Sequence, residues 1–125
     1  MALVTTPSAS TIIQCAINVH KTLGPGLFES AYQPMLSAEM KRAGLRFKEQ
    51  VTLPLSRDGI VVTKAYRADF IVEDEVIVEI KSIAKLLPVH RSQMLTYLKL
   101  SGLRKGLVFN FNVVLLKHGL MSVVN

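Results

Sequence analysis

Two runs of alternating side chains flank the acidic triplet Glu73-Asp74-Glu75, and they constrain this chain more than any other feature. Because successive side chains of a β-strand point to opposite faces, residues 67–81 predict two antiparallel strands joined by a tight turn centred on Asp74. In this register the side chain of Asp69 faces that of Glu79. One face of the hairpin is then wholly apolar and consists of Ala68, Phe70, Val72, Val76, Val78 and Ile80.

The second face of this hairpin carries its charged residues. From the turn outward it presents Ile71 with Ile77, Asp69 with Glu79, and Arg67 with Lys81. Two directly opposed carboxylates have Cβ atoms roughly 5 Å apart and repel by on the order of 3 kcal/mol at an effective dielectric constant of ~20. Either a shared proton or a divalent cation removes this cost. Oxygen donors suit Mg²⁺ or Mn²⁺, and a lysine beside the cation can orient water or neutralise a phosphate.

The same charged pattern also fits an ordinary solvent-exposed strand. Edge strands carry acids and lysines that keep them soluble, and Glu79 with Lys81 would form a surface ion pair that contributes about 0–1 kcal/mol. The apolar neighbours Ile71 and Ile77 favour a cleft instead, because a sheet that is apolar on both sides near its turn is covered on both sides. Asp69 would then lie in that cleft with Glu79.

The rest of the chain predicts helices that pack against these strands. The expected helices are residues 12–23, 28–43 and 88–102, and Ser10 or Thr11 could cap the first of them. The further expected strands are residues 47–55, 60–65 and 106–111, with one or two more over 113–124. This order of elements predicts an α/β (α+β) domain whose sheet is flanked by helices.

Length and composition indicate one domain with a hydrophobic core. The chain has 125 residues, of which 50% are hydrophobic, and we expect a flexible leader over residues 1–9 and a single domain over 10–125. The single cysteine, Cys15, excludes an intrachain disulfide and a multi-cysteine zinc site, and it favours a reducing compartment. No basic region precedes an apolar run at the N-terminus, so no signal peptide is indicated and a cytoplasmic location is expected. No stretch approaches the ~18 consecutive apolar residues that a membrane span requires.

The charge balance suits a polyanionic partner. Lys and Arg number 15 against 9 Asp and Glu, which gives a net charge of +6 and a pI near 9.7. Such a surface can bind the phosphate backbone of a nucleic acid, although a solvated surface with a mild excess of lysine has the same balance. Aromatic residues are only 6% and tryptophan is absent, so no base-stacking platform or sequence-specific readout is indicated.

Two motifs give the chain a resemblance to known proteins. The segment Gly26-Leu27-Phe28-Glu29-Ser30-Ala31-Tyr32 resembles the motif of the small bacterial GxxExxY family, and the resemblance extends over about residues 12–116. Asp69 followed by Glu79-Ile80-Lys81 on consecutive strands resembles the PD-(D/E)XK nuclease superfamily, among which that family is placed. The proline of the superfamily's name is absent, because Ala68 precedes Asp69. The resemblance implies a three-layer domain with a mixed central sheet and helices on both sides.

The resemblance also implies a role for each matching residue. Asp69 and Glu79 would be ligands of Mg²⁺ or Mn²⁺, and the carbonyl of Ile80 would complete the inner set of ligands. Lys81 would be the catalytic lysine. Glu29, near the start of the second expected helix, matches the helical acid that many members of the superfamily direct at the same metal.

Three more residues are candidates by resemblance to RecB-type nucleases. Gln93 and Tyr97 match their Gln-x-x-x-Tyr motif, and a spacing of four places both on one helix face, where they could hold a phosphate or support Lys81. A surface amide beside a packed tyrosine would look the same. His20 matches their upstream helical histidine near the metal, but a histidine that packs in the core or caps a helix fits equally well.

These observations predict a metal-dependent nuclease that hydrolyses phosphodiester bonds of DNA, with RNA as the less favoured substrate. The acids Glu29, Asp69 and Glu79 would hold the cation, and Lys81 would assist. The alternative is a non-catalytic adaptor of the same fold that binds nucleic acid or protein, and a component of an antitoxin or defence system is a third reading. A homodimer that presents two sites to a duplex suits so small and apolar a chain.

Overall fold

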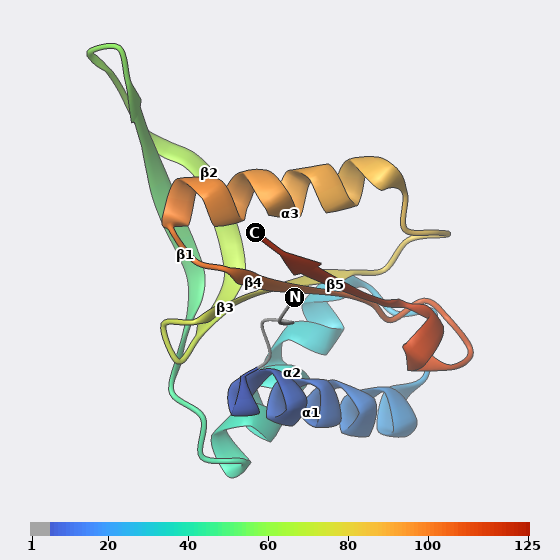
Figure 1. Ribbon diagram of the computed structural model, residues 1–125. Helices are drawn as coiled ribbons and strands as arrows, with labels where there is room; N and C mark the ends of the chain where they lie inside the picture. The colour runs from blue at the N-terminus through green and yellow to red at the C-terminus, as the bar shows by residue number, and fades with distance from the viewer. Residues whose placement is uncertain (1–5) are drawn as a thin grey trace, which may run out of the picture.

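A five-stranded sheet lies between two helices on one side and one helix on the other in the computed structural model, which describes residues 6–125 (Figure 1). The strands, in their order across the sheet, are β1 (Phe47–Arg57), β2 (Ile60–Val72), β3 (Val76–Lys81), β4 (Lys105–Asn110) and β5 (Leu120–Val124). The helices are α1 (Pro7–Leu23), α2 (Glu29–Arg42) and α3 (Pro88–Ser101), and a 3-10 turn, η1, covers Leu116–His118. Only β3 and β4 run parallel. The predicted three-layer fold with a mixed central sheet is therefore confirmed.

The first helix begins earlier than its apolar spacing indicated. Thr6 caps α1 by accepting a hydrogen bond from the backbone N–H of Ala9 at 3.0 Å, and Pro7 occupies the first helical position, where its missing N–H costs nothing. Residues 7–9 of the expected leader are therefore helical, while residues 1–5 lie outside the part that the structure describes. The expected start was late because the apolar period begins only at Ile12.

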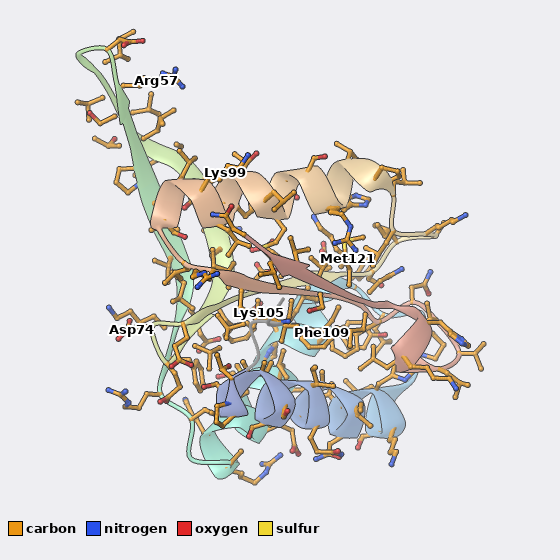
Figure 2. The ribbon with its side chains drawn as sticks, in the orientation of Figure 1. Arg57, Asp74, Lys99, Lys105, Phe109 and Met121 are labelled. Carbon is orange, nitrogen blue, oxygen red and sulfur yellow. The ribbon has the colours of Figure 1, made fainter. Side chains whose placement is uncertain are left out.

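Two apolar clusters fill the spaces on either side of the sheet. The cluster toward α1 and α2 includes Ile12, Tyr32, Leu36, Phe70, Val78, Phe109 and Phe111, and the cluster toward α3 includes Ala68, Ile77, Met94, Leu98, Val108 and Val123. Figure 2 shows Phe109 and Met121 on opposite sides of the sheet. The expectation that Ala68 shares a face with Phe70 is wrong, because β2 leaves its regular pairing at Asp69, between these two residues.

The hairpin of β1 and β2 extends beyond the three layers, with Arg57 near its tip (Figures 1 and 2). Its register shifts at Pro54, which has no N–H to donate to the neighbouring strand. The two strands expected over 60–65 and 67–72 are one continuous strand in this hairpin. Ile60 and Val61 are 66% and 64% exposed near the tip.

The β2–β3 hairpin has the predicted register near its turn. Phe70 pairs with Val78, and the pairs closer to the turn follow the same register. Glu73 and Asp74 adopt positive φ angles of 54° and 52° in the turn. The pairing ends at Phe70, so the expected pair of Arg67 with Lys81 is not formed.

Tyr32 fixes the loop that leads into α2. Its buried ring stacks on Phe111 with the ring centroids 4.4 Å apart. Its hydroxyl donates to the carbonyl of Gly24 at 2.7 Å and accepts from the N–H of Leu27 at 3.3 Å. The hydroxyl of Ser82 donates to the carbonyl of Leu27, so the loop is also joined to the chain just after β3. The start of α2 is therefore held beside the carboxyl end of β3.

Replacing Tyr32 with phenylalanine should test this anchor. Tyr32→Phe keeps the stack on Phe111 but leaves the carbonyl of Gly24 without its donor. We expect the free energy of unfolding, measured with urea, to fall by about 1–2 kcal/mol. Tyr32→Leu, which also removes the stack, should cost more. Equal stability of Tyr32→Phe and the wild type would show that the hydroxyl does not hold the loop.

Candidate active site

Asp69 lies where β2 loses its regular pairing with both neighbouring strands. The register of β1 skips Gln50, the residue opposite Asp69. On the other side, the pairing with β3 runs from the turn only as far as Phe70 and Val78, so it stops one residue before it reaches Asp69. Buried backbone groups require other partners at such a break, and here side chains supply them.

The carboxylates of Asp69 and Glu79 each bind the backbone of the opposite strand. The N–H of Asp69 donates to Oε1 of Glu79 at 2.9 Å, and the N–H of Ile80 donates to Oδ2 of Asp69 at 2.8 Å. Each carboxylate thus uses one oxygen to join the strands. The other oxygen of each has no hydrogen-bond partner within residues 6–125. The two acids therefore meet between β2 and β3 through these side-chain hydrogen bonds, although the regular pairing in which the sequence placed them opposite each other has already ended at Phe70.

Glu79 is the most perturbed titratable group of this site. Its side chain lies among buried residues, with 8% relative exposure. Burial first, and then the charges of Asp69 and Glu29, raise the pKa of Glu79 to about 8, although the N–H of Asp69 and the charge of Lys81 oppose the rise. Glu29 and Lys81 are therefore close enough to act on Glu79 electrostatically. A cation between the two carboxylates would offset the cost of burying their charge.

Helix α3 brings Tyr97 to the same two acids. Burial raises the pKa of Tyr97, and the charges of Glu79 and Asp69 add to the rise. The ring of Tyr97 stacks on that of Tyr66 with centroids 4.3 Å apart, and the hydroxyl of Tyr66 donates to the backbone carbonyl of Tyr97 at 3.1 Å. Gln93 is exposed one turn earlier on α3. Of the predicted pair, Tyr97 is therefore close enough to respond to the charges of both acids, whereas Gln93 is exposed.

Helix α2 and strand β2 border a hollow of about 420 Å³ next to Asp69. It is lined by Glu29, Ser30, Gln33, Pro34, Gln50, Arg67 and Asp69. The amide of Gln33 donates to the carbonyl of Asp69 at 3.4 Å and to Oε1 of Glu49 at 3.2 Å. Gln33 was not among the residues expected at the site, although it follows Glu29 by one helical turn on the same face of α2.

The structure does not bring His20 to these acids. Its Nε2 lies 2.8 Å from the carbonyl oxygen of Val113, and its ring centroid is 6.2 Å from that of Phe111. It lines a different hollow, together with Lys21 and residues 114–117. His20 thus has the position of a core histidine with a satisfied ring nitrogen, which was the alternative to a metal ligand.

The donor atoms at Asp69 and Glu79 suit a hard divalent cation. Each carboxylate has an oxygen free of other bonds, and Ile80, whose carbonyl is the third expected donor, follows Glu79 directly. Oxygen ligands of this kind are those that Mg²⁺ and Mn²⁺ prefer. Across residues 6–125, however, no three His, Cys, Asp or Glu side chains are grouped so that they could hold a metal ion. Glu29 therefore approaches the pair from the hollow without completing a cluster.

Comparison with family models decides the relationship. Residues 7–123 match the model of the PD-(D/E)XK nuclease superfamily, which covers nearly the whole chain. The chain belongs to the PD-(D/E)XK nuclease superfamily. Comparisons with curated proteins and with solved structures found no significant match. PD-(D/E)XK nucleases generally use divalent metals and act on nucleic acids.

No helix in the described part of the chain is long and apolar enough to cross a membrane.

The raised pKa of Glu79 predicts how stability depends on pH without metal. With a pKa of about 8 in the folded protein and 4.5 as the reference value, Glu79 keeps a proton on folding between these pH values. The contribution of Glu79 to the free energy of unfolding is therefore fully present below pH 4.5 and is lost as the pH rises to about 8. Over this range the free energy of unfolding falls by at most about 1.4 kcal/mol per pH unit.

Glu79→Gln isolates this contribution because it keeps the shape of the side chain and removes the titration. In urea unfolding with EDTA, the wild type should lose stability relative to Glu79→Gln as the pH rises from about 5 to about 8. Parallel stability curves of the two proteins over this range would contradict the raised pKa.

Proposed function

We propose that this chain is a metal-dependent nuclease that hydrolyses phosphodiester bonds in DNA, and in RNA as a less favoured substrate. The observation that carries the proposal is the pair of carboxylates, Asp69 and Glu79, joined across two strands with Lys81 beside them. In a PD-(D/E)XK fold this grouping supplies acids for a cation and an ammonium group for a phosphate. The Glu29 and Tyr32 positions support membership of the GxxExxY family within the superfamily.

Asp69, Glu79 and the residues around them have distinct roles in this proposal. Asp69 and Glu79 would hold Mg²⁺ or Mn²⁺ through their free oxygens, with the Ile80 carbonyl as a further donor and Glu29 approaching from α2. The bound cation would supply an ionised water and polarise the phosphate. Lys81 lowers the pKa of Glu79, so its charge lies where it can neutralise a phosphate oxygen during hydrolysis.

The side of the site toward α3 would contact the substrate backbone. Tyr97 lies near both acids, and Gln93 precedes it by one turn on the same face of the helix. Their hydroxyl and amide groups suit a phosphate oxygen or the ammonium of Lys81. The net charge of +6 supports a polyanionic substrate, and binding should therefore weaken as salt is added.

One observation favours the alternative of a non-catalytic adaptor that binds nucleic acid or protein. Because the pKa of Glu79 is about 8, the pair of Glu79 and Asp69 holds a proton at neutral pH and needs no cation to be stable. The fold therefore tolerates the acids without metal. Turnover distinguishes the two functions, since the adaptor would bind without cutting.

Cleavage assays should decide between these functions. The purified protein is incubated with labelled single-stranded, duplex and branched DNA in Mg²⁺, Mn²⁺ or EDTA. We expect cleavage only with metal, and a loss of at least about 100-fold in Asp69→Asn and in Lys81→Gln, because each removes charge that the transition state requires.

Matched variants away from the site serve as controls. Asp74→Asn changes a carboxylate in the β2–β3 turn, where asparagine tolerates the positive φ, and Lys99→Gln removes a lysine on the exposed side of α3 (Figure 2). Both should cut as the wild type does. Undiminished cutting by Asp69→Asn would point to a contaminating nuclease, and salt-sensitive binding without any cutting would indicate the adaptor.

A further inference from the structure

Gln50 has a backbone conformation that is unusual for its place in the fold. Its φ angle is 51°, in the left-handed region that residues with a side chain seldom adopt. The other described non-glycine residues with positive φ, Asp58, Glu73 and Asp74, lie at hairpin turns that favour this conformation. Gln50 instead lies within β1, where an extended backbone is the ordinary state.

This irregularity coincides with Asp69. Between Phe47 and Leu53, the residues of β1 pair with β2 in one regular register, and the pair of Gln50 with Asp69 is the one that is missing from it. The backbone groups of Asp69 bond instead to the side chains of Glu79 and Gln33. Irregular residues of this kind redirect side chains, and they are frequent beside active sites.

Gln50 also shares the hollow of about 420 Å³ with Glu29, Arg67 and Asp69. Gln50 is exposed, and within residues 6–125 its carboxamide makes no hydrogen bond to the protein. Arg67 likewise forms no ion pair with any residue that the structure describes. A free amide and a free guanidinium therefore border a space large enough for a small ligand, directly beside the acids.

We propose that Gln50 is a substrate-contacting residue, and that its carboxamide, together with Arg67, holds the nucleotide adjoining the scissile phosphate in this hollow. This inference rests on the proposed nuclease function. The amide can donate to phosphate or sugar oxygens and accept from a base edge, while the guanidinium pairs with phosphate. The left-handed backbone at residue 50 places the amide in the hollow. The contact of this amide with the substrate explains why an unfavourable backbone conformation persists there.

Gln50→Gly separates this role from a structural one. Glycine adopts a positive φ without steric cost, so the urea midpoint should be no lower than that of the wild type. The loss of the amide should raise KM by about tenfold or more, with kcat changed less than about threefold. Asp58→Gly also replaces a left-handed residue with glycine, but in the distant β1–β2 turn, and it should alter neither KM nor kcat.

Binding without turnover gives a second measurement. Anisotropy of a fluorescein-labelled single-stranded oligonucleotide in Ca²⁺ should show weaker binding by Gln50→Gly, by about tenfold or more, and an intermediate affinity for Gln50→Asn, which retains a shorter amide. Wild-type affinity and KM in Gln50→Gly would overturn this inference alone, because the nuclease would still cut. Absence of both binding and cutting by the wild type would overturn the proposed function and this inference with it.

Discussion

The exchange of hydrogen bonds between Asp69 and Glu79 is the interaction on which the rest of the site depends. A regular antiparallel ladder would pair the backbones of β2 and β3 and send both carboxylates outward from one face. Here each carboxylate takes the place of a backbone partner on the opposite strand. The strands stay joined although their ladder has ended, and one oxygen of each acid remains available between them.

Helix α2 contributes to the site through anchors that are remote from its acidic residue. The hydroxyl of Tyr32 fixes the loop before the helix, Ser82 joins that loop to the end of β3, and Gln33 reaches the carbonyl of Asp69. Glu29 therefore approaches the acids from a helix that is held at three points. In physical terms, the glycine and tyrosine of the Gly-x-x-Glu-x-x-Tyr motif shape and pin a loop, and the acid between them faces the hollow.

The sequence predicted a sheet flanked by helices, the order of most elements and the register of the β2–β3 turn, because these follow from side-chain alternation and helical period. The three layers with a mixed sheet were implied by the resemblance to the PD-(D/E)XK nuclease superfamily. The sequence could not predict the break at Asp69, since alternation assumes a regular ladder, and for that reason Ala68 was placed on the wrong face. It also missed Gln33 and Gln50, whose amides are ordinary surface residues by type. The homodimer, the cytoplasmic location and the domain start at residue 10 stay predictions.

Several irregular features of the sheet meet at one residue, and their coincidence is itself an argument for function. Asp69 is flanked by a left-handed residue on β1, by a buried acid of raised pKa on β3, and by a helix amide above its carbonyl. The left-handed backbone of Gln50 and the burial of the Glu79 carboxylate each cost stability, whereas the hydrogen bond from Gln33 holds the carbonyl of Asp69 in place. Stability alone does not favour several unfavourable features at one point, but a site that must present free oxygens beside a substrate requires them.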